Sequence, residues 1–186
     1  MIANDLSREE VKALVYSYEK PEVTNQLFEF GKMLLEEVED RSRRINSQSV
    51  TVLGWSMAII AFLVSGINRA PTGISGYFAL GSAIAALIAM VFSSNALRTR
   101  PNWGLPSDKS WIHGSALVQE DELKRYHIRV IYDVMKGNVP LVNSKSRSIY
   151  IAEVSLIVAA SALIMGFAYQ LLLAKFSSIA IFTSVI

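Results

Sequence analysis

The chain lacks cysteine altogether and has only two histidines among its 186 residues. The first absence excludes disulfides, thiolate metal sites and a cysteine nucleophile, and it leaves the redox environment open. The two histidines, His113 and His127, are 14 residues apart, which is not the spacing of metal ligands. A zinc or acid–base site at His127, which follows a run of three acidic residues, is one interpretation. A half-buried histidine on a packing face is the other.

Charge is also missing over long stretches of the chain. Residues 45–68 and residues 70–97 contain no charged side chain, and residues 148–174 contain one, Glu153. A bilayer core of about 30 Å needs about 20 apolar residues in a helix, and lipid offers no partner to unpaired backbone groups. The sequence therefore predicts an all-α membrane protein with three transmembrane helices and a small cytoplasmic helical bundle.

Basic residues are almost absent from one side of these three segments. Sixteen of the 18 lysines and arginines lie in residues 8–44 and 98–147, whereas Arg69 and Lys175 lie on the other side. Short loops rich in lysine and arginine stay in the cytoplasm. We therefore predict a multi-pass protein of the cell inner membrane, with a cytoplasmic N-terminus and a periplasmic C-terminus. The small net charge of +2 follows from this asymmetry and gives no reason to expect direct nucleic-acid binding.

The first polar segment, residues 1–44, is expected to hold two amphipathic helices. Ser7 and Glu10 form the capping-box pattern that starts the first of them, and Pro21 ends it. The second helix is expected to lead into the first transmembrane segment through a polar hinge at residues 46–49. Each helix needs a partner for its apolar stripe.

The second polar segment, residues 98–147, begins with a loop rich in proline and glycine. An amphipathic helix is expected over residues 115–136, with Gly137 and Asn138 as its stop and Pro140 just beyond. This helix is the expected partner of the N-terminal pair. Together the three helices would form the cytoplasmic bundle.

Two further features of the sequence concern the membrane surface. Trp103 and Trp111 flank the proline-rich loop. Tryptophan favours the headgroup level, so membrane anchoring is the favoured interpretation and stacking on a ligand is the alternative. Residues 175–186 form a short apolar outer tail that we expect to lie on or re-enter the outer leaflet, or to pack against a neighbouring protomer.

Small residues recur at helical spacing in all three apolar segments. Gly81, Ala85 and Ala89 are four residues apart in the second segment, as are Ala162 and Gly166 in the third. Such stripes allow helices to approach closely in lipid, which predicts a tight bundle and a homo-oligomer. The first segment carries a similar stripe, made of Ala58, Ala61 and Ser65.

Glu153 is the single charge within the third apolar segment. An ionisable group inside a membrane costs about 2.5 to 3.5 kcal/mol at the bilayer centre and often marks a functional site. Glu153 lies six residues beyond Arg147, which is about 9 Å along a helix. It therefore either lines or gates a pore, or it reaches the interface and forms an ion pair with Lys145 or Arg147.

The layout resembles a known class of membrane proteins. An acidic and then arginine-rich run at residues 39–49 (EDRSRRINSQS) leads into a two-span hairpin. A basic approach to the last span follows, over residues 131–150. Over roughly residues 36–168 the chain resembles the small transmembrane effectors of bacterial anti-phage systems, such as SLATT-type domains and the membrane effectors of Pycsar-type signalling.

The resemblance implies an oligomer that disrupts or permeabilises the bacterial inner membrane when a signal reaches its cytoplasmic part. No nucleotide-binding module is recognisable in this chain, so the expected trigger is a regulatory protein. We expect no enzymatic activity and no cofactor, because no span carries paired carboxylates, a histidine cluster or a nucleophile with its base. The alternative function is that of a non-toxic membrane anchor or scaffold subunit for a cytoplasmic enzyme.

Overall fold

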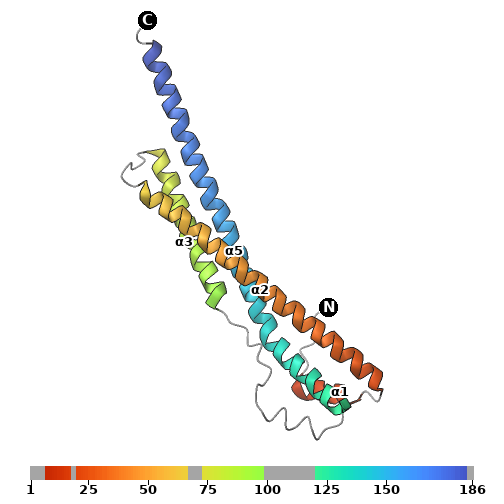
Figure 1. Cartoon of the computed structure of the whole chain (residues 1–186). Helices are drawn as coiled ribbons and strands as arrows, with labels where there is room; N and C mark the ends of the chain where they lie inside the picture. The colour runs from red at the N-terminus through yellow and green to blue at the C-terminus, as the bar shows by residue number, and fades with distance from the viewer. Residues whose placement is uncertain (1–6, 18–19, 67–72, 99–119, 184–186) are drawn as a thin grey trace. The chain divides into compact units, whose positions relative to one another are not determined.

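The chain is helical in the computed structural model, and the described residues contain four helices and no strand. The described residues are 7–17, 20–66, 73–98 and 120–183. The helices are α1 (Arg8–Ser17), α2 (Pro21–Ser65), α3 (Ile74–Arg98) and α5 (Glu120–Thr183) (Figure 1). The prediction of an all-helical fold is confirmed for these residues. The helices α2, α3 and α5 are each long and apolar enough to cross a membrane.

The chain divides into two compact units. Unit 1 comprises residues 1–44 and 100–144, and unit 2 comprises residues 45–99 and 145–186. The N-terminal parts of α2 and α5 belong to unit 1 and their C-terminal parts belong to unit 2. The boundaries fall close to those expected between the polar and the apolar segments of the sequence.

Unit 1 is built from α1 and the N-terminal parts of α2 and α5. The capping box forms as predicted, because the amide of Ser7 donates to a carboxylate oxygen of Glu10 at 2.7 Å and the amide of Glu10 donates to the Ser7 hydroxyl at 3.3 Å. Val11 and Val15 are the buried side chains of α1. This short helix is thus held by two valines and a satisfied N-terminus.

The prediction that the second amphipathic helix stops at Gly137 and Asn138 is wrong. Helix α5 continues through both residues and through Pro140. A proline inside a helix removes one backbone donor and crowds the preceding turn. Asn138 and Val142, which flank the proline, are each only 2% exposed, whereas Pro140 is exposed. Burial of the flanking side chains therefore keeps the backbone helical where the local sequence favours an end.

Two other expected breaks are absent from the helices. The polar run at residues 46–49 lies inside α2, and the Ser49 hydroxyl donates to the Ile45 carbonyl of the same helix at 2.8 Å. Because the hydroxyl bonds to its own helix, this serine does not interrupt the helix. Residues 175–183 of the expected separate tail continue α5 to Thr183.

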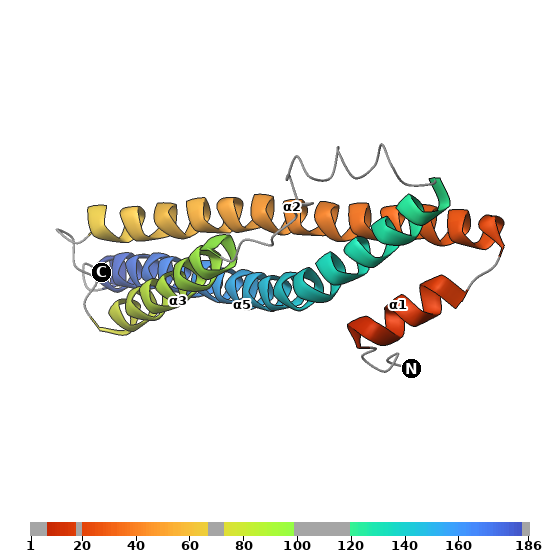
Figure 2. The ribbon, with the colours of Figure 1, turned by 90° about the horizontal axis from the view of Figure 1, so that it is seen from below.

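Unit 2 contains α3 alongside the C-terminal parts of α2 and α5 (Figure 1 and Figure 2). Along the packed side of α3 runs a row of alanine and serine residues, at intervals that alternate between four and three. These residues, buried or partly buried, are Ser75, Ala79, Ser82, Ala86, Ala89, Ser93 and Ala96. The Ser82 hydroxyl donates to the Ala159 carbonyl of α5 at 2.8 Å. Small side chains thus bring the two backbones within hydrogen-bonding distance of a serine.

The stripe predicted on this helix differs from the packed one by a residue. Ala85 and Ala89 are buried, but Gly81 is exposed and a Cβ atom there would meet nothing within 4 Å. Each step of four residues turns a helix by about 400°, so a stripe with constant intervals of four drifts by about 40° per step. Alternating intervals cancel this drift, which is why Ser82 lies on the packed side and Gly81 does not.

Helix α5 also approaches α3 closely at Gly166. Gly166 of α5 is buried, and a Cβ atom there would lie 3.0 Å from the Cβ atom of Phe78 on α3. Ala162, one turn earlier, is partly buried. A larger residue at position 166 would therefore have to displace α3.

Candidate functional site

The buried side of α2 in unit 2 follows the same alternating intervals as α3. Its fully buried members are Ile45, Ser49, Val52 and Ser56. The two hydroxyls donate to carbonyls of their own helix, at 2.8 Å for Ser49 and 2.7 Å for Ser56. The serines therefore behave as small side chains with satisfied polar groups. These buried residues of α2 need no polar partner from another helix.

A buried lysine lies where the apolar segments of α2 and α5 begin. Lys145 of α5 is 2% exposed and lies on the buried side of that helix, followed at helical intervals by Ile149, Ala152 and Ala159. We call the contact between the buried sides of α2 and α5 in unit 2 the seam. The Lys145 ammonium donates to the side-chain carbonyl of Asn46 on α2 at 3.0 Å. Lysine is almost never fully buried unless it is paired. Here its hydrogen-bond partner is a neutral amide, so the charge itself is not compensated by this bond.

The surroundings of Lys145 make its charge costly. The charged residues within one turn of Asn46 and Lys145 on their own helices are Arg43, Arg44 and Arg147, all of them basic. Burial lowers the pKa of Lys145 below its ordinary value. A cation is thus buried with one neutral hydrogen-bond partner.

The structure separates Glu153 from the bases that the sequence proposed for it. Glu153 is half-buried on α5, and Arg147 is exposed. Among the described residues no ion pair joins Glu153 to Lys145 or to Arg147, and the Lys145 ammonium bonds Asn46 instead. The eight residues from 145 to 153 turn a helix about 80° past two turns, so the two side chains leave α5 in different directions.

Unit 1 holds a second polar cluster, where α1 meets the start of α5. The Arg125 guanidinium pairs with Asp121 at 2.8 Å and donates to the Tyr16 carbonyl at 3.2 Å. It also lies over the Tyr16 ring, 5.7 Å from its centroid. This arginine therefore fastens α1 to α5 through a charge-assisted hydrogen bond and a cation–π contact.

The histidine of unit 1 lies among aromatic rings. The His127 ring centroid is 5.9 Å from that of Phe28 and 6.1 Å from that of Tyr126. The described residues contain no group of three or more His, Asp or Glu that could hold a metal ion. The packing interpretation of His127 is the one this geometry favours. Trp103, Trp111, His113 and Arg69 lie outside the described residues.

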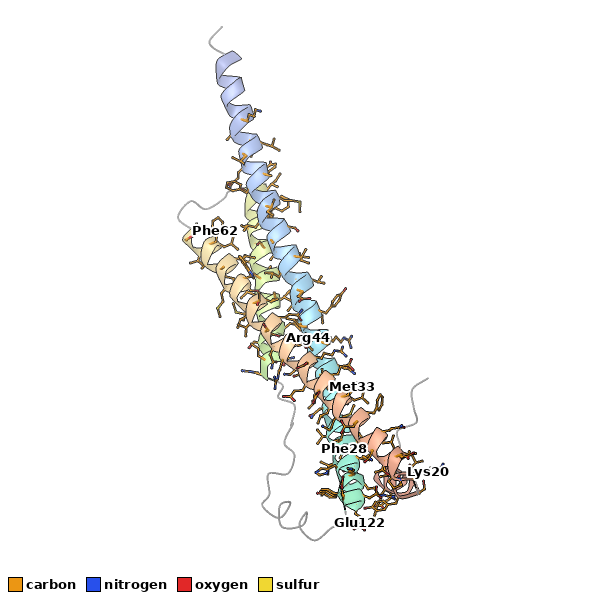
Figure 3. All side chains as sticks on the ribbon, turned by 45° about the vertical axis from the view of Figure 1, so that its right-hand side comes forward. Lys20, Phe28, Met33, Arg44, Phe62 and Glu122 are labelled. Atoms are coloured by element: carbon orange, nitrogen blue, oxygen red, sulfur yellow. The ribbon has the colours of Figure 1, made fainter. Side chains whose placement is uncertain are left out.

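The exposed side of α2 in unit 2 carries a row of small residues that the sequence showed only in part. The row, which forms the floor of this surface, consists of exposed residues at alternating intervals of three and four, namely Thr51, Gly54, Ala58, Ala61 and Ser65. Large exposed side chains border the floor on both sides; they are Val50, Trp55, Met57, Phe62 and Val64. Figure 3 shows one of them, Phe62, on the last turns of α2. We call this surface the α2 groove.

The sequence singled out Ala58, Ala61 and Ser65 but neither Thr51 nor Gly54, which extend the α2 groove by two turns. From the sequence, Lys145 was proposed as an ion-pair partner of Glu153, and its burial was not predicted. The signal for its burial was present, since Val142, Lys145, Ile149 and Ala152 follow one another at intervals of three and four.

Comparisons of the chain with protein-family models, with curated proteins and with solved structures gave no match.

Proposed function

We propose that this chain is a membrane-embedded effector that oligomerises and permeabilises the bacterial inner membrane when triggered, in defence against phage. The observation that supports the proposal most is the α2 groove. It has the residue type and the spacing by which α3 packs within the chain, yet it is exposed on a helix apolar enough to span a membrane. A small-residue groove between two ridges suits a second helix in lipid, where close contact is the main attraction.

The extent of exposed apolar surface supports assembly further. In the most apolar 18-residue window of each candidate span, 17%, 28% and 11% of the residues are buried within the chain, for α2, α3 and α5 in turn. The remaining surface is available to lipid and to other protomers. An assembly of such protomers could surround or thin a patch of bilayer. The polar side chains of the spans, including Glu153, would then determine which solutes pass through the membrane.

The orientation and the trigger are part of the same proposal. The distribution of basic residues favours a cytoplasmic unit 1 and a periplasmic end of α5. A regulatory protein or other cytoplasmic signal would act on unit 1. The short helix α1 suits such a role, because its ten residues are held by two buried valines and by Arg125.

A cysteine-free chain allows a direct test of assembly. An Ala58→Cys variant, with its thiol in the α2 groove, should form disulfide-linked dimers in native membranes under mild oxidation. Val91→Cys places a thiol on an exposed apolar residue of α3 and serves as the control. Equal cross-linking of the two variants would contradict assembly through the groove.

Permeabilisation is tested by inducible expression with a dye that reports membrane potential. Expression should depolarise the membrane and stop growth. Gly54→Ile, which fills the floor of the α2 groove, should suppress both effects, whereas Leu87→Ile on the exposed side of α3 should not. Expression that never depolarises the membrane, with or without the products of neighbouring genes, would contradict the effector function.

The second candidate function is that of a membrane anchor for a cytoplasmic enzyme. It is favoured by large exposed apolar residues of unit 1, which are Leu14, Tyr16, Phe30 and Met33. Such residues mark a surface that a partner protein could cover. Copurification of a stoichiometric enzyme that is lost in a Phe30→Ser/Met33→Ser double variant would support this function over the first.

A further inference from the structure

We propose that Lys145 and Asn46 form a latch, which holds α2 and α5 closed at the start of their apolar segments and whose release exposes the lysine. The inference rests on the proposed function in one respect, namely that release of the latch accompanies activation. Its structural part stands on the contact between the two side chains alone. That contact is the hydrogen bond of 3.0 Å between a 2% exposed lysine and a single amide.

The latch differs from the other buried positions on the α2 face. The remaining fully buried members of the α2 face in unit 2 are aliphatic, or they are serines whose hydroxyls bond their own helix. Those positions gain from contact and lose nothing polar when the helices close. At Lys145, closure instead removes the ammonium from water, and the ammonium gains only one hydrogen bond, to a neutral oxygen. The seam is therefore weakest at this pair.

The position of the pair makes this weakness useful. Asn46 and Lys145 lie at the boundary where α2 and α5 pass from unit 1 to unit 2. Each helix continues across that boundary without a break. A displacement of either helix in unit 1 is therefore transmitted along the backbone to this pair. We therefore expect the hydrogen bond between Lys145 and Asn46 to break when α2 or α5 is displaced.

The released state has a partner for the charge. Lys145 precedes the apolar segment at residues 148–174 by three positions, which is about 4.5 Å along a helix. A lysine there can extend its ammonium to the headgroup layer, where water and lipid phosphate solvate it. The same side chain thus costs free energy in the closed seam and is well solvated outside it. This difference favours two distinct states, with Lys145 either buried against Asn46 or solvated at the membrane surface, over a series of intermediate positions.

The latch makes a prediction about chemical accessibility. We would treat the full-length protein in native membranes with a membrane-permeant amine-acylating reagent, and measure acylation of Lys145 by mass spectrometry. Lys12, which is exposed on α1, provides the internal reference. In the closed protein Lys145 should be protected relative to Lys12. Equal acylation of the two lysines would overturn the proposal.

Two substitutions of the amide should act in opposite directions. Asn46→Ala removes the acceptor and should raise Lys145 acylation by about tenfold, as expected when a buried donor loses its partner. Asn46→Asp supplies a carboxylate and should lower acylation below that of the wild type. Tyr150→Phe alters an exposed residue of the same helix and should leave it unchanged. If Asn46→Ala fails to insert, Asn46→Asp still decides, and unchanged acylation in that variant overturns the latch.

Depolarisation is measured separately on the same variants. Asn46→Ala should depolarise the membrane without a trigger. The double variant Asn46→Ala/Lys145→Met should not, because no buried cation then drives the helices apart. Acylation of Lys145 decides the latch whether or not any variant depolarises the membrane. A chain that never depolarises it contradicts the effector function alone.

Discussion

Helices α2 and α5 meet in both units, and they do so with different kinds of side chain. In unit 1 the contact uses rings and a branched aliphatic residue. The Phe28 ring lies 5.9 Å from that of His127, and Ile131 fills the space over Gly31, where a Cβ atom would be 3.4 Å away. In unit 2 the contact joins Ile59 and Ile60 of α2 to Ala159 of α5, in a cluster that Ala85 and Ala86 of α3 complete.

The interval between packed residues is nevertheless the same along the whole of α2. The packed residues follow one another by alternate steps of four and three, from Thr24, Phe28, Gly31, Leu35, Val38 and Ser42 to Ile45, Ser49, Val52, Ser56, Ile59 and Leu63. In water, burying a large apolar side chain contributes about 25 cal/mol per Å². In lipid that gain vanishes, and close approach of backbones takes its place. The period is thus the same in both units, and the small buried residues of unit 2 are concentrated on α3.

The largest effect should come from shortening a buried side chain in unit 1. Ile131 is 6% exposed, and its replacement by alanine removes apolar contacts and leaves a cavity. We expect Ile131→Ala to lower the free energy of unfolding by about 2 to 5 kcal/mol. The measurement is urea unfolding of the full-length protein in detergent micelles. Leu141→Ala, on an exposed residue of the same helix, should cost far less. Similar losses for both would contradict the packing described for unit 1.

In unit 2 the damaging change is the opposite one, an enlargement. Gly166→Val should lower the free energy of unfolding by about 1 to 3 kcal/mol, because the added atoms meet Phe78 at 3.0 Å or less. Gly81→Val is the matched control, since it makes the same substitution within an apolar helix where nothing lies within 4 Å. If both variants unfold at the same urea concentration, α3 and α5 do not approach as closely as the structure indicates.

The comparison also explains what the sequence could predict. The three apolar segments and the capping box of α1 follow from local rules of charge, length and periodicity, so they were predictable. The continuation of α5 through Gly137 was not predictable, because burial of Asn138 and Val142 overrides the local preference at Pro140. Tertiary contacts of this kind leave little trace in a single sequence.

The candidate site was only partly accessible from the sequence for a related reason. Gly81 was selected because intervals of four are easily recognised, whereas the packed side follows alternating intervals that place Ser82 inward. The base at position 145 fitted the rule that positive residues mark the cytoplasmic boundary. That rule counts charges and is silent about burial. Only the position of Lys145 relative to Asn46 reveals that this base faces the neighbouring helix.

A smaller effect should accompany pH. Burial lowers the pKa of Lys145 below its ordinary value of 10.5, so the folded protein releases this proton more easily than the unfolded chain does. The free energy of unfolding is then lowest below the lowered pKa. It should rise as the pH increases from there towards 10.5, by at most about 1.4 kcal/mol per pH unit.

Urea unfolding at a series of alkaline pH values measures this rise. Lys145→Met should abolish the rise, and Lys12→Met, on an exposed lysine, should preserve it. A rise of the same size in Lys145→Met would assign it to another group. The test sharpens the comparison, because it probes the one charged residue in a seam that is otherwise made of small or aliphatic side chains.

The smallest effect should be confined to α1. The Ser7 amide and then the Ser7 hydroxyl hold the pKa of the Glu10 carboxyl below its ordinary value of 4.5. Because the folded pKa is the lower one, the stabilisation is complete above pH 4.5 and is lost as the pH falls through the lowered pKa. Loss of this carboxylate frees the Ser7 amide at the first turn of a helix of only ten residues.

Hydrogen exchange provides the measurement, since it resolves a local opening that global unfolding does not. Protection factors of the α1 amides should fall as the pH is lowered from about 4.5 to about 3, which is roughly the range in which exposed carboxyl groups titrate. Those of α3 should stay constant over the same range. Glu10→Gln should remove the pH dependence, and Glu9→Gln, on the adjacent exposed residue, should retain it. Protection that falls equally in both variants would mean that α1 is held by Val11, Val15 and Arg125 without help from its cap.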